Sequence, residues 1–272
     1  MKRRQSATHR DESPWFRPQW PVPDSVGALM STRRGGVGQA PFDSLNLKAD
    51  IGDDPVAVAE NRARHARRCS AIPVWLNQVH GACVARLTQP PINGPLPEAD
   101  ASVTTQAGLA CSILVADCMP VLLAARNGRA VAAAHAGWRG LAGGVSQAAV
   151  IAVCNGAHCD PGEVVAWLGP AIGPRAFEVG ADVLRAFGEP ATAGREAPRF
   201  KAVAAPPSSP PKWLADLPGL VRERLRAAGV NALYGNDGSA AWCTVGNPSD
   251  FFSFRRDGGV TGRLAASVWL LG

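Results

Sequence analysis

Residues 129–168 read RAVAAAHAGWRGLAGGVSQAAVIAVCNGAHCDPGEVVAWL, and they contain a helical run between two short apolar runs with the character of β-strands. The strands are predicted over residues 129–135 and 164–168, and the helix over residues 141–154. Strand-like and helical runs alternate in the same way along the rest of the chain. This alternation is typical of the α/β class.

The remaining elements are predicted from the same patterns of apolar residues. The expected strands cover residues 74–79, 110–115, 232–234 and 251–254, and the expected helices cover residues 55–69, 181–187, 214–228 and 262–270. Because strands occur in both halves of the chain, we expect an α/β (α+β) fold. In this fold a mixed β-sandwich, or one large mixed sheet, is flanked by helices.

The chain is expected to consist of a tail and one domain. Residues 1–24 are charged, proline-rich and unpatterned, so we expect a disordered or loosely attached tail. Residues 25–272 are expected to form a single domain. The proline-rich stretch 202–211 is expected to be a surface loop of this domain.

The composition argues against several classes of protein. The chain has 272 residues, and 46% of them are apolar, which suffices for a buried core. The net charge of +6 comes from dispersed basic residues, so no nucleic-acid partner is expected. The chain starts without the apolar stretch of a secretion signal, and its longest apolar run, 107–125, is interrupted by Asp117 and too short for a membrane span. An odd number of cysteines, seven, favours free thiols or metal ligands in a cytoplasmic protein.

Three apolar, strand-like runs each end in a side chain that can bind a transition metal. His80 ends the run WLNQVH, Cys118 ends SILVADC, and His135 ends AVAAAH. Two imidazoles and a thiolate are a suitable ligand set for Zn²⁺ with a fourth position left open, as in catalytic zinc sites. The gaps of 38 and 17 residues match no compact zinc motif. A buried cysteine and two histidines bound to backbone carbonyls therefore explain the pattern equally well.

A second cluster, Cys154, His158 and Cys159, looks more like a compact metal motif. It follows a predicted helix and lies among turn dipeptides, so we interpret it as a helix end and an exposed loop. The two remaining histidines, His9 and His65, are interpreted as residues of the tail and of a helix surface.

A glycine-rich connection, AGWRGLAGG, follows His135 and joins a predicted strand to a predicted helix. Such a connection exposes backbone N–H groups that can bind an anion, and Arg139 adds a bidentate donor. Glycines that only permit a tight turn, beside a structural Arg139, explain the sequence equally well.

Taken together, these segments resemble the bacterial YfiH-type family, long labelled polyphenol oxidases or laccase-domain proteins and now described as purine nucleoside phosphorylases. The resemblance runs from about residue 31 to the end of the chain, although Gly38 stands where the family has a serine. The matching segments are RGGV (34–37), FDSLNL (42–47), GDD (52–54), NR (61–62), NQVHG (77–81), ADA (99–101), ADCMP (116–120), HAGWRG (135–140), GPAIGP (169–174), DL (216–217), CT (243–244) and FFSFRRDG (251–258).

The resemblance implies a metal held by His80, Cys118 and His135 in one catalytic domain of residues 25–272. It also implies two reactions, which are phosphorolysis of adenosine, inosine, guanosine or methylthioadenosine, and deamination of adenosine to inosine. The expected partners are therefore a purine nucleoside and phosphate. Zn²⁺ is the expected cofactor, with Cu²⁺ as an alternative. The oligomeric state is left open.

Two further residues are candidates for catalytic roles. Arg139 and the amides of residues 140–144 are candidates for holding phosphate while charge builds on the leaving base. Asp117 adjoins Cys118 and is a candidate for proton transfer. Asp100 and Glu178 are the other carboxylates in the matching segments.

Other functions fit the same metal-binding residues. A cysteine hydrolase that edits peptidoglycan precursors would use Cys118 as nucleophile and a histidine as base. A polyphenol oxidase with a single copper is compatible with Met119 as an axial ligand, but five histidines in the whole chain are too few for a multicopper centre. A non-enzymatic nucleotide-binding protein is the third alternative, supported by positive charge and clustered aromatic residues.

Overall fold

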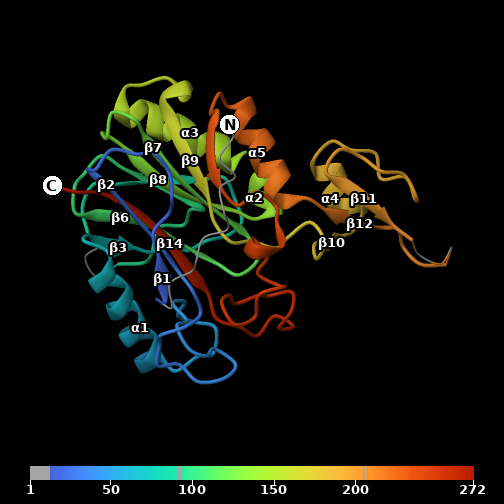
Figure 1. Ribbon diagram of the computed structural model, residues 1–272, viewed down its shortest axis with the longest axis horizontal. Helices are drawn as coiled ribbons and strands as arrows, with labels where there is room; N and C mark the ends of the chain where they lie inside the picture. Colours follow the sequence, from blue (N-terminus) through green and yellow to red (C-terminus); the bar gives the residue numbers. More distant parts are fainter. Residues whose placement is uncertain (1–12, 91–93, 205, 207) are drawn as a thin grey trace, which may run out of the picture.

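The computed structural model describes residues 13–90, 94–204, 206 and 208–272. It forms one domain in which two mixed β-sheets lie face to face (Figure 1). The first sheet has the order β1-β2-β14-β6-β3, and its strands are β1 Trp15–Phe16, β2 Val26–Ser31, β3 Ile72–Val74, β6 Leu109–Val115 and β14 Leu264–Leu270. The second has the order β13-β9-β7-β8-β5-β4, and its strands are β4 Val84–Leu87, β5 Ala101–Thr104, β7 Met119–Ala125, β8 Val131–Ala136, β9 Val164–Leu168 and β13 Ala232–Gly235.

Helices pack outside the two sheets. Two longer ones cover the outer face of the second sheet, namely α3 Val145–Ala157 and α5 Leu217–Ala227. The short helix α2 Trp138–Ala142 precedes α3, and α1 Pro55–Arg68 lies beside the first sheet (Figure 1). Two short 3-10 turns complete the helices, η1 Pro161–Glu163 and η2 Ala240–Trp242. Within the described ranges, no helix is long and apolar enough to cross a membrane.

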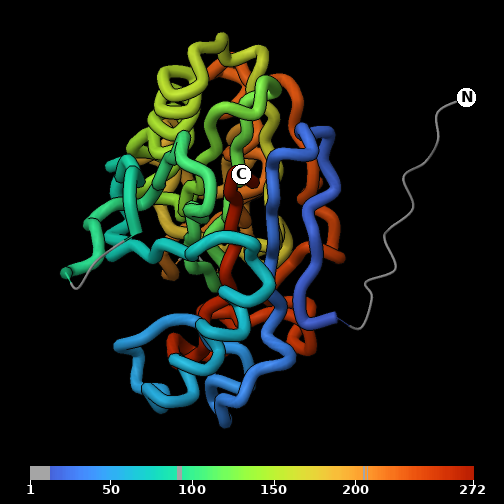
Figure 2. Tube along the Cα trace, turned by 90° about the vertical axis from the view of Figure 1, so that its left-hand side faces the viewer, coloured from blue at the N-terminus to red at the C-terminus, as the bar shows by residue number. Residues whose placement is uncertain are grey.

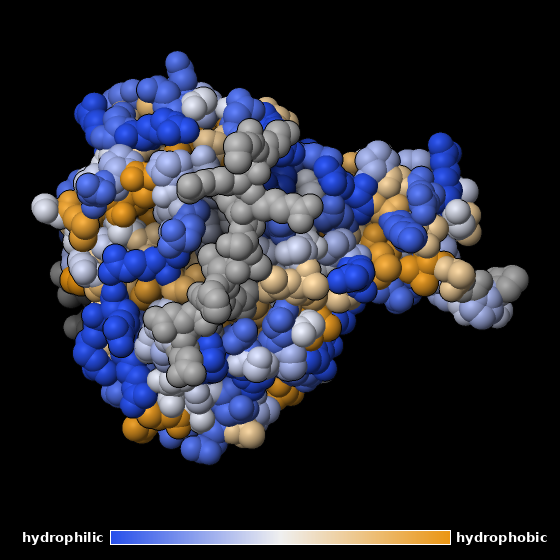
Figure 3. All heavy atoms as spheres, viewed as in Figure 1, coloured by the Kyte–Doolittle hydropathy of each residue, from blue (hydrophilic) through white to orange (hydrophobic). Residues whose placement is uncertain are grey.

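A smaller sheet forms an arm that projects from the domain. The arm consists of β10 Glu178–Val179, α4 Ala181–Ala186, β11 Phe200–Val203 and β12 Lys212–Ala215, with the strand order β10-β12-β11. Figure 3 shows the arm extending beyond the rounded body of the molecule, with hydrophilic and hydrophobic residues interspersed on the visible face.

The inner strands of the two sheets are buried on both faces, as β7 illustrates. Leu122 and Ala124 pack into the core between the two sheets, whereas Val121 and Leu123 pack against the helices on the outer side. Burying apolar side chains on both faces supplies the main driving force for this layered packing. The predicted mixed β-sandwich flanked by helices is confirmed.

The predicted final helix over residues 262–270 is wrong, because Leu264–Leu270 is β14, the central strand of the first sheet. All seven of its side chains are buried, and it pairs with β2 on one side and with β6 on the other. Leucine and alanine favour helices in isolation. A strand that is buried on both faces lacks the polar alternation that would have identified it.

Other predicted bounds agree or differ for local reasons. The strands predicted at 110–115, 129–135, 164–168 and 232–234 and the helices at 55–69 and 181–187 agree within two residues. The helix predicted at 141–154 is divided into α2 and α3 by Gly143 and Gly144. Residues 251–254, predicted as a strand, lie in a loop, and the predicted strand 74–79 is a strand only at its first residue. Residues 214–215, predicted as the start of a helix, belong to β12. The loop predicted at 202–211 begins inside β11.

The predicted tail of residues 1–24 differs from the structure after residue 12. Residues 1–12 lie outside the described residues. Trp15 and Phe16 form β1, which pairs antiparallel with β2, and the Trp15 side chain is buried. Residues 13–24 therefore include a strand of the first sheet, because the buried indole ties this segment to the domain.

His65, interpreted from the sequence as a helix-surface residue, is fully buried. Its Nδ1 accepts a hydrogen bond from Trp15 Nε1 at 3.2 Å, and its Nε2 lies 2.9 Å from Ser267 Oγ. The indole N–H requires an unprotonated Nδ1, so the ring is neutral. Burial accordingly lowers the pKa of His65 to about 4.

Stability is expected to fall at acidic pH through His65. In the unfolded chain His65 is protonated below its ordinary pKa of 6.5, whereas in the folded chain it is protonated only below about pH 4. The free energy of unfolding of the metal-free protein should therefore drop by up to about 3 kcal/mol between pH 6.5 and 4, beyond the carboxylate contribution. Urea unfolding at both pH values measures this drop. His65→Gln should lose it and His158→Gln should keep it, and identical pH slopes for the wild type and His65→Gln would contradict the assignment.

Candidate metal centre

Three side chains predicted to bind a metal converge at one end of the sandwich. His135 lies near the end of β8 and is buried, whereas Cys118 is half-buried in the turn that leads from β6 of the first sheet into β7 of the second. His80 comes from the loop after β3 and is exposed, with a left-handed φ of 61°. The potential ligand atoms all lie within 4.8 Å of one another, and Cys118 Sγ is 3.9 Å from His80 Nε2.

Asp100, just before β5, contacts the segments of both histidines through its carboxylate. Its carboxylate is fully buried and accepts hydrogen bonds from the backbone N–H groups of Val79, His80 and Gly81 at 3.1, 2.9 and 2.6 Å. It also lies 2.8 Å from Nδ1 of His135. A carboxylate at Nδ1 fixes the imidazole tautomer, so Nε2 of His135 is the nitrogen left for a metal.

The glycines of the HAGWRG segment are required by close approach to the ligands. A Cβ at Gly137 would lie 2.8 Å from Cys118 Sγ and 3.1 Å from His80 Cδ2, and a Cβ at Gly140 would lie 2.7 Å from the carbonyl of Gly81. Any larger residue would push the ligands apart. The motif therefore packs the start of α2 directly against the cluster.

The electrostatics of the cluster favour an ionised thiol. Burial raises the pKa of Cys118, but the charge of His135 and hydrogen bonds from His135 and His80 outweigh burial and lower this pKa to about 6. Burial lowers the pKa of His135, but Cys118 and Asp100 outweigh it and raise this pKa to about 9. Without a metal, a thiolate lies beside an imidazolium at neutral pH. The thiolate is the form of cysteine that binds metals and acts as a nucleophile.

The donor set fits a zinc ion. Tetrahedral zinc with its usual bond lengths holds a nitrogen and a sulfur ligand about 3.5 Å apart, close to the 3.9 Å between His80 and Cys118. Because one ligand is exposed, a fourth position would open toward solvent. The assignment of the three residues as ligands stays a prediction that this geometry supports.

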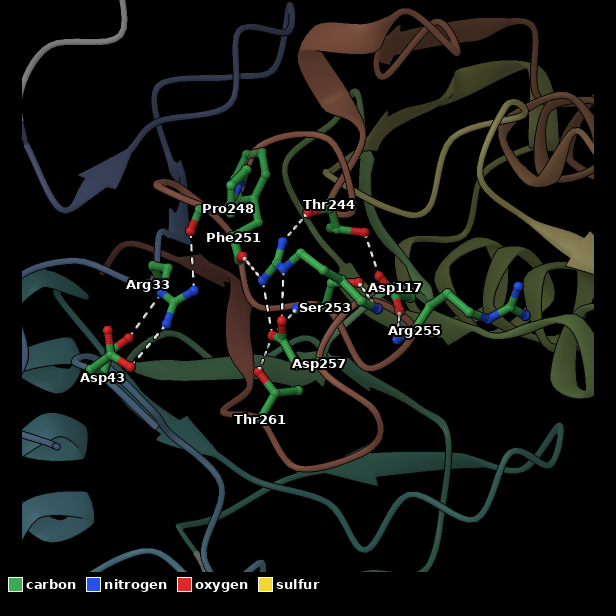
Figure 4. Close-up of polar contacts among 11 residues, drawn as sticks. Arg33, Asp43, Asp117, Thr244, Pro248, Phe251, Ser253, Arg255, Asp257 and Thr261 are labelled. Carbon is green, nitrogen blue, oxygen red and sulfur yellow. Dashed lines mark hydrogen bonds and ion pairs between the residues drawn. The ribbon is translucent and has the colours of Figure 1, made fainter. Parts of the chain in front are cut away.

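Asp117, the candidate for proton transfer, is engaged in structural contacts. Its Oδ1 accepts a hydrogen bond from Thr244 Oγ1 at 2.5 Å, and its Oδ2 accepts one from the backbone N–H of Arg255 at 2.7 Å (Figure 4). The residue adopts a left-handed φ of 85°. Asp117 therefore anchors the turn that carries Cys118 to the loop of residues 244–255. Sequence adjacency suggested a catalytic carboxylate but could not show that its oxygens are occupied.

The candidate phosphate loop is only partly available. The N–H groups of Leu141, Gly143 and Gly144 donate to carbonyls within the same stretch, at 2.8, 2.9 and 3.2 Å, and so cannot also donate to an anion. Arg139 is exposed and its guanidinium lies 4.3 Å from the ring of Trp138. Within the predicted anion site, Arg139 is therefore available to bind an anion, whereas most of the loop amides already donate to backbone carbonyls.

The remaining candidates lie elsewhere. His158 ends α3 in a left-handed conformation and is exposed, which agrees with its interpretation as a helix end. Glu178 lies in β10 with its side chain exposed. All seven cysteines are free thiols. The sequence names Asp100 only as one carboxylate of the matching segments, and its role in holding the two histidines depends on contacts between separate segments.

Comparison with known proteins places the chain in a family. Residues 27–271 match the family described as multi-copper polyphenol oxidoreductase laccase. The chain is 47% identical to the Pseudomonas aeruginosa protein named purine nucleoside phosphorylase PA4543, over 94% of this chain and 98% of that one. It is 46% identical to the Escherichia coli protein named purine nucleoside phosphorylase YfiH, over 93% and 98%.

Solved structures agree with this relationship. The crystal structure of Neisseria meningitidis protein NMB0706 superposes with a TM-score of 0.82 at 41% identity, covering 96% of this chain and all of the other. The structure of YlmD from Geobacillus stearothermophilus superposes with a TM-score of 0.83 at 31% identity, covering 97% and 98%. The chain therefore belongs to the YfiH-type family of purine nucleoside phosphorylases, whose members also carry the laccase-domain description.

Proposed function

We propose that the protein is a zinc-dependent purine nucleoside phosphorylase. It converts adenosine, inosine, guanosine or methylthioadenosine, together with phosphate, into the free base and the pentose 1-phosphate, and it deaminates adenosine as a side activity. The observation that carries this proposal is the convergence of His80, Cys118 and His135 within 4.8 Å, in a chain whose relatives bear the name purine nucleoside phosphorylase.

In this proposal the side chains of the protein hold and orient the reacting groups. The zinc ion, when bound, supplies Lewis acidity. Asp100 keeps His135 in the tautomer that presents Nε2 to the site, which is a positioning role. We assign Asp117 a positioning role as well, because Thr244 and Arg255 occupy its two oxygens.

Arg139 stays in the proposal as a contact for an anionic group. It is exposed at the start of α2, next to the ligands, and it has no ion-pair partner among the residues that the structure describes. Its position over Trp138 restricts the guanidinium without neutralising it.

The dependence on phosphate tests the proposed reaction. The zinc-loaded protein is expected to release adenine and ribose 1-phosphate from adenosine in equal amounts, only when phosphate is present. Removing zinc should stop adenine release. Inosine formed without phosphate reports the deaminase activity separately. Adenine release that does not depend on phosphate would exclude phosphorolysis.

A cysteine hydrolase is the second candidate, because the pKa of Cys118 is lowered to about 6 beside a histidine. Such an enzyme needs its thiolate free, whereas a zinc enzyme needs it bound to the metal. Zinc removal therefore separates the two functions, since it would stop phosphorolysis and would activate the hydrolase. Copper in the purified protein would not identify an oxidase, because Cu²⁺ binds nitrogen and sulfur sites more tightly than Zn²⁺.

A further inference from the structure

We propose that Lys48, Arg62 and Arg263 form the phosphate-binding subsite of the reaction. These three residues, called the cationic cluster below, would bind a phosphate dianion beside the metal ligands. The inference rests on the proposed function for its place in a reaction, but the anion binding itself can be measured separately. None of the three was a candidate from the sequence.

Backbone contacts assemble the cluster from three distant segments. Asn46 is the centre, because its Oδ1 accepts from the backbone N–H groups of Lys48 and Arg263 at 3.0 and 2.9 Å. Leu47 links the same segments, since its N–H donates to the carbonyl of Arg263 and its own carbonyl accepts from Arg62 Nε at 2.9 Å. Figure 2 shows the segments near residues 40–70 and 250–262 gathered at the same end of the molecule.

The charge of the cluster is only partly offset by nearby carboxylates, since Asp50 acts on Lys48 and Arg62 and Asp117 acts on Arg263. All three cations are half-buried, and none forms an ion pair within the part of the chain that the structure describes. Burial and the neighbouring charge of Arg263 lower the pKa of Lys48, with Asp50 as the carboxylate that opposes them. Three like charges held together in partial burial are unfavourable unless an anion binds among them.

The cluster extends to the metal ligands through Arg263. Leu264 pairs with Val115 in the first sheet, so Arg263, the residue before it, lies beside the segment 116–118 that carries Cys118. Burial lowers the pKa of Arg263, and the negative charges of Cys118 and Asp117 act against burial. The side chain is fixed in place, because it donates to the carbonyls of Thr261 and Gly262 at 2.6 and 3.1 Å. A fixed guanidinium loses little entropy when it binds phosphate.

The position of Arg62 is fixed in a similar way. Besides its bond to Leu47, its guanidinium lies 5.1 Å from the centre of the Trp75 ring. Lys48 differs from both arginines, because its ammonium group has no hydrogen-bond partner among the described residues. Lys48 can therefore be changed with the least damage to packing, and it is the residue to test first.

Titration with inorganic phosphate tests the cluster directly. Calorimetry on the full chain, prepared with and without zinc, is expected to detect phosphate binding in both states. Lys48→Met should weaken this binding at least about tenfold, because it removes a charged hydrogen-bond donor. Lys48→Arg should restore it. Arg129→Ala is the matched control, since it removes an arginine without an ion pair at the opposite end of β8 from His135, and it should leave binding unchanged.

The source of the phosphate group is decided by a second titration. Adenosine 5′-monophosphate should compete with inorganic phosphate only if the subsite accepts phosphate esters. Phosphate binding without such competition shows that the subsite takes free inorganic phosphate, and competition by adenosine 5′-monophosphate would show that its ligand is a phosphate ester. Thermal unfolding of each variant, measured alongside, shows that the change in binding is not a loss of folding.

Activity measurements separate this inference from the proposed function. Phosphate binding that is lost in Lys48→Met, in a protein that shows no phosphorolysis, supports the subsite and refutes the phosphorylase. Phosphorolysis with an unchanged KM for phosphate in Lys48→Met refutes the subsite and leaves the phosphorylase intact. Absence of phosphate binding to the wild type at millimolar concentrations also overturns the subsite.

Discussion

Replacing His80 by alanine is expected to abolish metal binding and to reduce purine nucleoside turnover by at least about 10³-fold, or about 4 kcal/mol of transition-state stabilisation. His80 is one of three donors that lie within 4.8 Å of one another. Two donors cannot close a site that needs three, so phosphorolysis and deamination should be lost together. Metal content by elemental analysis and both product assays measure the effect.

The matched control for this variant is His158→Ala. His158 belongs to the cluster with Cys154 and Cys159 that most resembles a metal motif in the sequence, but it is exposed at the end of α3. Its replacement should change neither metal content nor turnover. Equal losses of metal and turnover in the two variants would contradict the assignment of the metal to His80, Cys118 and His135. Full activity of His80→Ala without metal would favour a metal-free reaction.

The sequence yields His80, Cys118 and His135 as candidate ligands because the signal for each is local, and the structure brings the three together. His80, Cys118 and His135 each follow an apolar run, and strand ends on one side of a sandwich meet at the same edge. The same holds for α1 and β9, whose apolar periodicity and bounding turns lie within the segment itself. Features that are determined within a single segment can therefore be predicted from the sequence.

Features that depend on contacts between distant segments could not be predicted. β14 was expected to be a helix because its burial on both faces arises only from pairing with β2 and β6. His65 looked like a surface residue because Trp15 and Ser267, which enclose it, come from opposite ends of the chain. In the sequence Asp100 is one carboxylate among several, and only its contacts with two histidines distinguish it.

The phosphate site shows the same difference in chemical terms. From the sequence, Arg139 is the candidate for anion binding because it lies in a glycine-rich loop after His135, a pattern typical of anion sites. In the folded chain several of the loop amides bond to carbonyls of the same stretch, and the three half-buried cations that lie together are Lys48, Arg62 and Arg263, where we propose that phosphate binds. The balance of charge depends on which residues the fold brings together, so it locates an anion site better than a loop pattern in the sequence does.

Asp100→Asn is expected to weaken zinc binding by about 10–100-fold while the chain still folds. The carboxylate accepts four hydrogen bonds, two at each oxygen, from Val79, His80, Gly81 and His135. An asparagine side chain of the same shape must turn its amide N–H₂ toward two of these donors. Both the loop that carries His80 and the tautomer of His135 then lose their support.

The readout that distinguishes positioning from mere structural support is zinc dependence. Nucleoside turnover of Asp100→Asn should be low at stoichiometric zinc and should recover when zinc is in excess, because the ligands are still present. Asp100→Ala should be less stable than the wild type by about 3–5 kcal/mol, since it leaves the buried donors and the His135 charge without a partner. Asp160→Asn, which alters an exposed cap at η1, is the control and should change neither zinc affinity nor turnover. A wild-type zinc affinity in Asp100→Asn would show that the ligands hold their geometry without this carboxylate, and the metal centre would then be preorganised by the packing of Gly137 and Gly140 alone.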